Sequence, residues 1–308
     1  MIRFRCDACG AETAESESTH PACLRKLFGM PRVPELDLRL EDVHAVAQRS
    51  AGHLSISGAQ PKVSLSVIRG KLMPVENGGE YILKPRTQTF LNTPENENLC
   101  TMMASHLGID VPPHTLIELK DGSYAYVSRR FDRGRGGQKI HVEDFQQILG
   151  LDDKYEGSFE QIGKRLIEVS AFPGLDAQYF FERVLFFFII GNGDSHLKNF
   201  SVMHLEDGGI KLAPAYDIVS SRLAVPREKG ELAIPMNGKK NGVALKDFRD
   251  FARYLDIGNK ALDNILSRYR LNDERISALI LTSKLPAPSK KRLKDIMLER
   301  LRRVNLHV

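Results

Sequence analysis

The sequence lacks an apolar run long enough to cross a lipid bilayer. Its longest uninterrupted run, Val184 to Ile190, has seven residues, whereas a membrane-spanning helix needs about 20. We therefore expect this run to be a buried helix. A targeting segment is also lacking, because Arg3 and Arg5 are followed by cysteines and acidic residues instead of an apolar stretch. These absences exclude a helical membrane protein and predict a cytoplasmic location without membrane partners.

Cysteine is scarce, with 4 residues in 308, and three of the four lie near the start, in Cys6-x-x-Cys9 and His20-x-x-Cys23. Thiolate and imidazole ligands on two tight turns can enclose a tetrahedral zinc ion. The alternative is a small loop with free cysteines. A disulfide framework is not expected, since no signal peptide is recognised and Cys100 lies on the apolar face of a predicted helix. A zinc ion here would brace the N-terminal lobe or a partner site.

Charge of one sign is not in large excess. The net charge is +5, and 42% apolar and 27% charged residues are typical of a globular chain that can bury two cores. Much of the positive charge lies in residues 290–303, a predicted amphipathic helix with Leu293 and Leu301 on its apolar face and Arg300 on its polar face. This face is either solvated or in contact with an acidic partner or tRNA-bound substrate. Direct nucleic-acid binding is not expected.

A polar loop follows the apolar run and places Asp194 and Asn199 five residues apart. In the catalytic loop of protein kinases, an Asp and an Asn with this spacing serve the accepting hydroxyl and a magnesium ion. The order differs here, because His196 follows the Asp instead of preceding it. The spacing predicts phosphoryl transfer with Asp194 as the base, and a polar loop without chemistry is the alternative.

A predicted β-hairpin leads away from this loop. Apolar runs at 200–205 and 210–212 flank a turn-forming segment at 206–209. The returning strand leads to Asp217, and kinases use such a hairpin to bring a second magnesium-binding carboxylate beside the catalytic loop. We therefore expect Asn199 and Asp217 to bind Mg²⁺. A surface aspartate at the end of a strand is the alternative.

Two upstream segments contain candidates for the nucleotide phosphates. The first is the small-residue turn at 53–62, where backbone amides could approach phosphate oxygens; an ordinary hairpin turn has the same pattern. The second is Lys84, at the end of a predicted strand over 81–84. A helix is predicted from Thr93 to the residue before Gly108, with Glu97 in its first turn. Kinases pair such a lysine with a helix Glu, so we expect Glu97 to contact Lys84; two solvated charges are the alternative.

The predicted elements define an α+β fold, with a sheet-rich N-lobe and a mostly helical C-lobe. Strands cluster before residue 130, and helical periodicity dominates from residue 142 on. The expected division is a Cys/His segment at 1–30, an N-lobe at 31–133 and a helical C-lobe at 134–308. This is a two-lobed, protein-kinase-like architecture.

Five short motifs follow one another along the chain. They are Ser55 to Lys62 (Ser-Ile-Ser-Gly-Ala-Gln-Pro-Lys), Arg130 to Arg133, Glu143 to Phe145, Gly193 to Ser201, and Ala215 to Asp217. Their order is that of HipA-type serine/threonine kinases, and the chain resembles this family over about residues 50–222. The resemblance implies a HipA-like kinase fold, ATP with Mg²⁺, and the role of a toxin in a bacterial toxin–antitoxin module.

The resemblance also implies roles for single residues. Asp194 would be the catalytic base, Asn199 and Asp217 the magnesium ligands, and Lys84 the phosphate clamp. The other residues that it implies near the nucleotide are Ser57, Gly58, Ala59, Gln60, Glu97, Asp132 at the ribose, His196 and Lys198. Autophosphorylation would fall on Ser55 or Ser57.

The resemblance further implies partners. The phosphorylated substrate would be an aminoacyl-tRNA synthetase. Larger HipA proteins carry a small N-terminal subdomain that is missing here, so the chain looks more like the short HipT toxins of three-part operons. Their partners are a separate small protein like that subdomain and a DNA-binding antitoxin.

Two other functions stay open. A small-molecule kinase of the aminoglycoside or choline type has the same fold logic with a different acceptor. A catalytically silent pseudokinase with a zinc knuckle would act as a binding module. The complete set of Lys84, Asp194, Asn199 and Asp217 favours an active enzyme, because a silent scaffold has no chemical need for it.

Overall fold

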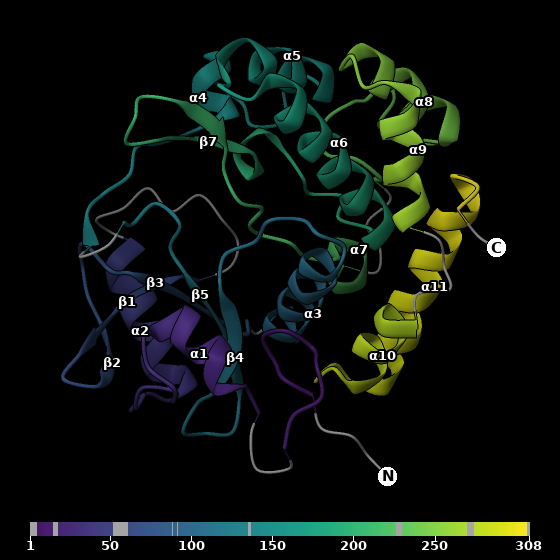
Figure 1. Ribbon diagram of the computed structural model, residues 1–308. Coiled ribbons are helices and arrows are strands. Elements are labelled where there is room, and N and C mark those ends of the chain that lie inside the picture. Colours follow the sequence, from purple (N-terminus) through teal and green to yellow (C-terminus); the bar gives the residue numbers. More distant parts are fainter. Residues whose placement is uncertain are drawn as a thin grey trace. The chain divides into compact units, whose positions relative to one another are not determined.

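The computed structural model describes residues 5–14, 18–51, 61–87, 89–90, 92–134, 137–225, 230–269 and 274–306. The chain divides into two compact units. Unit 1 comprises Met1–Met102, Pro112–Lys139 and Ala278–Leu285, and unit 2 comprises Met103–Val111, Ile140–Ser277 and Pro286–Val308. Most of their helices and strands are labelled in Figure 1. A sheet dominates the first unit and helices the second, so the expected α+β class is confirmed.

Unit 1 is built on an antiparallel sheet of five strands in the order β2-β1-β3-β5-β4. The strands are β1 (Val63–Ile68), β2 (Lys71–Pro74), β3 (Tyr81–Pro85), β4 (His114–Glu118) and β5 (Tyr124–Arg129). The predicted strand that carries Lys84 is therefore the central strand. Leu83 lies opposite Val63 of β1 and Val127 of β5. Because side chains alternate along a strand, Lys84 belongs to the other face of the sheet.

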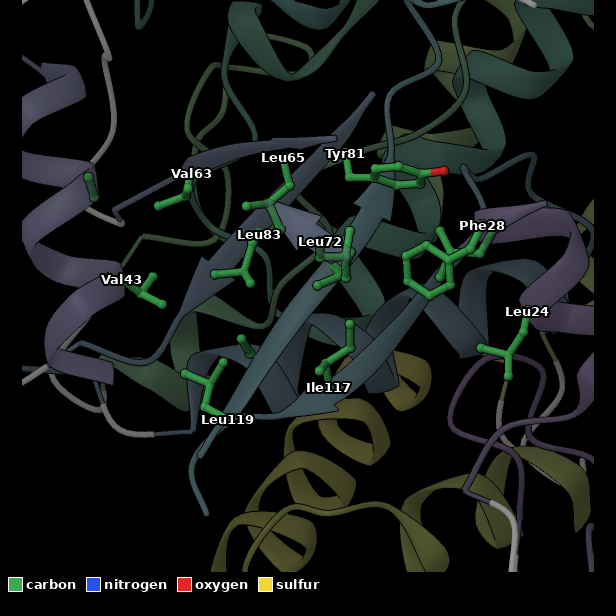
Figure 2. Close-up of a cluster of buried hydrophobic side chains, with 14 residues drawn as sticks. Leu24, Phe28, Val43, Val63, Leu65, Leu72, Tyr81, Leu83, Ile117 and Leu119 are labelled. Carbon is green, nitrogen blue, oxygen red and sulfur yellow. The ribbon is translucent and has the colours of Figure 1, made fainter. Parts of the chain in front are cut away.

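Helices α1 (Pro21–Phe28) and α2 (Leu40–Ala51) cover the face to which Leu83 belongs. Figure 2 shows the resulting apolar core, in which Phe28 of α1 and Val43 of α2 meet strand residues. The Phe28 and Tyr81 ring centroids are 5.2 Å apart. The other strand residues of this core are Val63, Leu65, Leu72, Leu83, Ile117, Ala125 and Val127, and Leu119, which follows β4, belongs to it as well. With this face buried, a register slip would move the whole set to the wrong side, so packing specifies the position of Lys84.

Helix α3 (Thr93–His106) is present where it was predicted. The helix ends at His106, and Gly108 follows with φ 89°. This left-handed conformation favours glycine after a helix. Glu97 lies in the first turns and is buried. Helix α10 (Glu274–Thr282) also contributes to unit 1 from Ala278 on.

Unit 2 is mainly helical. Its helices are α4 (Phe145–Leu149), α5 (Phe159–Val169), α6 (Pro173–Ile190), α7 (Ser221–Ala224), α8 (Leu245–Tyr254), α9 (Asn259–Arg268) and α11 (Ala287–Arg303). A small antiparallel sheet has the order β6 (Val142–Asp144), β7 (Ser201–His204) and β8 (Ile210–Leu212). The predicted hairpin is confirmed, since Val202 lies opposite Leu212 and His204 opposite Ile210.

Helix α6 forms the core of unit 2 and is buried from Phe180 to Ile190. Aromatic rings surround it, with Phe180 5.2 Å from Phe200 and Phe181 5.8 Å from Phe251 between ring centroids. The apolar run that was too short to span a membrane is thus a buried helix, as expected. In the part of the chain that the structure describes, no helix is both long and apolar enough to cross a bilayer.

The prediction for Arg300 was wrong. Helix α11 is amphipathic, but Arg300 lies on its buried side and is 1% exposed. Its guanidinium is 3.1 Å from Glu231 and lies 4.6 Å from the centre of the Phe188 ring. A partly buried carboxylate and an aromatic face therefore accommodate a charge that helical periodicity alone assigns to solvent.

Candidate active site

In unit 1, Lys84 and Glu97 form a buried ion pair. The Lys84 ammonium donates to a Glu97 carboxylate oxygen at 2.5 Å, and the two side chains are 6% and 1% exposed. Tyr126, opposite Lys84 on β5, places its ring centre 5.7 Å from the ammonium. The contact predicted between the strand and the helix is confirmed, and its use in binding phosphate stays a prediction.

Asp132, the expected ribose ligand, follows β5 and is bound by two arginines. Arg130 donates to both carboxylate oxygens, at 2.8 and 2.6 Å, and Arg133 donates to one of them at 2.8 Å. Burial would raise the pKa of the Asp132 carboxyl, but the hydrogen bonds and charges of these arginines outweigh burial and hold that pKa below its ordinary value. Asp132 is therefore ionised at neutral pH.

In unit 2, the end of α6 sets the start of the Asp194 loop. Gly191 has φ 72°, and its N–H closes the helix on the carbonyls of Phe187 and Phe188. The Ser221 hydroxyl then joins both sides of the turn, because it accepts from the Gly193 N–H at 2.8 Å and donates to the Gly191 carbonyl at 3.3 Å. The loop leaves the helix in one defined direction.

Asp194 is exposed, and its carboxylate is held by a residue that sequence reasoning missed. The Tyr155 hydroxyl donates to Asp194 Oδ1 at 2.9 Å. The Tyr155 ring also packs edge-on against His196, with 5.3 Å between ring centroids, and lies under the Lys154 ammonium. A tyrosine 39 residues upstream in a loop has no periodicity that would reveal this contact. The result is an accessible carboxylate held in a fixed orientation.

Asn199 is buried at the end of a single 3₁₀ turn, η2 (Leu197–Asn199). Its Oδ1 accepts from the His196 N–H at 3.0 Å. A carboxamide oxygen has two lone pairs, so this bond orients the oxygen and still leaves one lone pair for a cation. The predicted spacing of five residues thus corresponds to a tight turn between the two polar groups.

Asp217 follows the hairpin and has φ 54°, a left-handed conformation that is uncommon for a residue other than glycine. Its neighbour Tyr216 holds this position, because the Tyr216 hydroxyl donates to the Lys198 carbonyl at 2.7 Å and also bonds the Ser201 hydroxyl. Burial raises the pKa of Tyr216, so its hydroxyl stays protonated. Tyr216 therefore ties the Asp217 segment to the loop that carries Asn199.

The pKa of His196 is influenced by the carboxylates of both Asp194 and Asp217. Burial and the Lys154 charge lower the pKa of His196, whereas Asp194 and Asp217 both act to raise it. The net effect is a lowered pKa, so the imidazole is neutral at pH 7. One buried ring is thus within electrostatic reach of Asp194 and Asp217, which are 23 positions apart in sequence. Roles for His196 and Lys198 at a nucleotide stay predictions.

Arg183 of α6 is a second buried group that sequence reasoning missed. Burial lowers its pKa to about 10, while Asp110, Asp176 and Tyr216 act in the opposite direction. It therefore remains a cation at neutral pH, near enough to Tyr216 for the two groups to interact electrostatically. A charged residue within an apolar helix was the only available signal.

The remaining predicted residues divide into two groups. Cys6, Cys9, His20 and Cys23 come together, with their ligand atoms within 4.8 Å of one another. Ser55, Ser57, Gly58, Ala59 and Gln60 lie outside the described residues.

A strand lysine paired with a helix glutamate, and an Asp–Asn loop followed by a hairpin and a second Asp, are the features of the kinase-like fold. The family model of the HipA-like C-terminal domain matches residues 54–276, so the chain belongs to this family. The expected HipA-like, two-lobed fold is confirmed.

Several known proteins are similar to this chain. A Haemophilus influenzae protein named "Putative kinase" is 28% identical over 284 residues, which are 83% of either chain. "Putative kinase Y4mE" of Sinorhizobium fredii is 36% identical over 222 residues, covering 67% of this chain and 51% of the relative. "Serine/threonine-protein kinase toxin HipA" of Shewanella oneidensis is 27% identical over 61% of this chain and 51% of the relative. The chain thus spans about half the length of the last two.

A solved structure agrees with the fold. The Shewanella oneidensis MR-1 toxin–antitoxin complex of HipA, HipB and operator DNA matches with a TM-score of 0.71 and 23% identity. The match covers 97% of this chain and 76% of that chain.

Proposed function

We propose that this protein is an ATP- and Mg²⁺-dependent serine/threonine protein kinase, and that it acts as the toxin of a bacterial toxin–antitoxin module. The observation that carries the proposal is the arrangement in unit 2. There Asp194 is exposed and its carboxylate is oriented by Tyr155. Tyr216 links the loop of Asp194 to the segment of Asp217, and both carboxylates act on the pKa of His196. Such groups serve phosphoryl transfer when an acceptor hydroxyl and a metal must be positioned together.

Each residue has a defined task in this proposal. Asp194 accepts the proton of the substrate serine or threonine hydroxyl as the oxygen attacks the γ-phosphorus, the bond from that phosphorus to the bridging oxygen breaks, and ADP leaves. Asn199 and Asp217 supply the amide and carboxylate oxygens that Mg²⁺ prefers, and the ion, when bound, neutralises charge on the phosphates. Lys84, oriented by Glu97, contacts the phosphates. Asp132, kept ionised by its arginines, accepts from the ribose hydroxyls.

The biological role rests on the family. The HipA relative is named a serine/threonine-protein kinase toxin, and HipA was solved with HipB and operator DNA. By analogy we propose a DNA-binding antitoxin and a separate small N-subdomain-like protein as partners, and an aminoacyl-tRNA synthetase as substrate. The protein would act in the cytoplasm, where such a substrate is found. Ser55 or Ser57 would be autophosphorylated.

The catalytic assignment is tested with Asp194→Asn and Asp217→Asn. Each is expected to lower phosphate incorporation from labelled ATP by about a hundredfold or more, because Asp194→Asn removes the proton acceptor and Asp217→Asn removes a carboxylate that would hold Mg²⁺. Circular dichroism should show an unchanged fold. The matched control is Asp263→Asn, an exposed carboxylate on α9, which should retain full activity. Undiminished incorporation in either site variant would reject the assignment.

The acceptor class needs a separate experiment. The protein is incubated with labelled ATP and a bacterial lysate, and the label is followed into protein bands and into small molecules. A labelled protein that carries phosphoserine or phosphothreonine supports the proposal. Label in a small molecule alone would favour an aminoglycoside- or choline-type kinase, and absence of ATP binding in a thermal-shift assay would favour a silent binding module.

A further inference from the structure

The N-terminal Cys/His cluster has the geometry of a metal centre. The ligand atoms of Cys6, Cys9, His20 and Cys23 lie within 4.8 Å of one another. Cys9 Sγ and His20 Nδ1 are 3.4 Å apart. In a tetrahedral zinc site a sulfur and a nitrogen ligand are separated by about 3.6 Å and two sulfurs by about 3.8 Å. The Cys9–His20 distance is therefore close to that of two ligands of one zinc ion, and the other ligand atoms are near enough to share the ion.

The backbone preorganises the ligands. The turn closes with the Gly10 N–H on the Cys6 carbonyl at 2.8 Å and the Cys6 N–H on the Ala11 carbonyl at 2.9 Å. The His20 N–H donates to Cys6 Sγ at 3.3 Å. Cys23 lies in the first turn of α1. Ligands that are placed by two short segments need little rearrangement to bind a metal.

The second nitrogen of His20 defines which tautomer is present. His20 Nε2 is 2.8 Å from the carbonyl oxygen of Glu12. A carbonyl can only accept, so Nε2 carries the proton and Nδ1 has the free lone pair. Nδ1 is the nitrogen beside Cys9 Sγ. A ligating histidine with its other N–H on a backbone carbonyl is the common arrangement around protein-bound metals.

The cluster is also packed against the rest of unit 1. Asp7 lies between Cys6 and Cys9 in sequence. Its carbonyl accepts a hydrogen bond of 2.8 Å from Nδ2 of Asn98, which is buried. Thr19, next to His20, bonds Thr115 of β4 through its hydroxyl at 2.9 Å.

The same turn fits closely against α10. A Cβ at Gly10 would lie 2.0 Å from Leu279 Cδ2. Asn98, which is bonded to the Asp7 carbonyl of this turn, directly follows Glu97 in α3. The position of the turn therefore affects the position of Glu97, the partner of Lys84.

We propose that Cys6, Cys9, His20 and Cys23 bind one structural Zn²⁺, and that this centre holds the turn whose Asp7 carbonyl fixes Asn98 beside Glu97. Four protein ligands leave no open position, so the ion has a structural and not a catalytic role. The metal site is independent of the proposed kinase activity. Only a consequence of the metal site for phosphate binding by Lys84 would rest on that function.

The metal is tested directly on the full chain. Protein produced in zinc-supplemented medium and dialysed should contain about one zinc per chain by mass spectrometry of the metal. Cys9→Ser and His20→Ala should lose it, whereas His20→Cys, which restores a thiolate ligand, should keep it. His204→Ala is the control, because His141, Glu143 and His204 form another group of neighbouring ligand atoms; it should keep its zinc.

Cobalt gives a readout that does not depend on variants that fold poorly. Wild-type protein exchanged into Co²⁺ should show the visible bands of tetrahedral cobalt and thiolate charge transfer, and both should disappear when Zn²⁺ is added. Zinc-free wild-type protein that also fails to take up Co²⁺ would overturn the proposal. So would zinc that Cys9→Ser retains and His204→Ala loses, or a disulfide between these cysteines in freshly purified protein.

The bracing role is tested by coupling. Zinc should raise the melting temperature of the wild-type protein, and Asn98→Ala should bind zinc but show a smaller rise. Equal rises in both proteins would reject the bracing and leave the metal site intact. Neither measurement uses ATP, so failure of the kinase proposal would be recognised separately.

Discussion

The buried pair of Lys84 and Glu97 allows a quantitative prediction. Lys84→Met removes the cation 2.5 Å from a carboxylate that is 1% exposed. Removing one partner of a buried ion pair typically costs about 3–5 kcal/mol, because the other charge stays in a poorly solvated site. We expect the free energy of unfolding to fall by about this amount.

Replacing both partners should reverse part of this loss. In Lys84→Met/Glu97→Leu neither charge has to be desolvated, so the double variant should be more stable than Lys84→Met alone by about 2 kcal/mol. Its phosphate incorporation should nevertheless stay at background, because the cation that we propose binds the phosphates is gone. Recovered stability without recovered activity separates the structural role of the pair from its proposed role at ATP.

Urea denaturation followed by circular dichroism at pH 7 measures these differences. The control is Arg253→Met, which breaks the exposed pair of Arg253 and Asp250, 2.8 Å apart on one helix, and should cost less than about 1 kcal/mol. A cost for Lys84→Met no larger than that of the control, or additive effects in the double variant, would refute the reasoning.

Two further predictions concern stability. Gly191→Ala should cost about 2–4 kcal/mol in urea denaturation, since φ is 72° and the new Cβ would lie 2.8 Å from Ile296 Cγ2; Gly174→Ala, with open space around it, should change stability by less than about 1 kcal/mol, and equal costs would contradict the argument. Burial lowers the pKa of His114 to about 4, below its unfolded value of about 6.5, so stability is lost as pH falls from about 6.5 towards 4. Between pH 7 and 5 this loss is about 2 kcal/mol, and a His114→Gln variant that loses as much stability as the wild type over this interval would disprove it.

Local patterns predicted much of the site. The alternation around Lys84, the N-terminal signals before Glu97 and the turn formers between β7 and β8 each specify an element from a few neighbouring residues. The short spacings of Cys-x-x-Cys and His-x-x-Cys likewise predicted that these four side chains come together. The spacing of Asp194 and Asn199 is likewise contained in one loop.

Contacts between distant segments could not be predicted in this way. Tyr155 reaches Asp194 from a loop without periodicity, and Tyr216 was part of a motif but had no role until its hydroxyl was seen on the Lys198 carbonyl. Arg300 was placed on the wrong side of α11, because periodicity cannot reveal that the fold brings the partly buried Glu231 within 3.1 Å of it. Such groups are stabilised by partners that only folding supplies.

Helix and strand periodicity, turn residues and motif spacing act over a few positions, so local sequence is enough to specify which elements form and which residues carry polar chemistry. The way in which those residues are held depends on the tertiary structure. It pairs Lys84 with Glu97 in a dry site, places Asp217 in a left-handed conformation secured by Tyr216, and joins the Cys/His turn to Asn98. These arrangements depend on burial and on partners far apart in the chain, and local sequence determines neither of them.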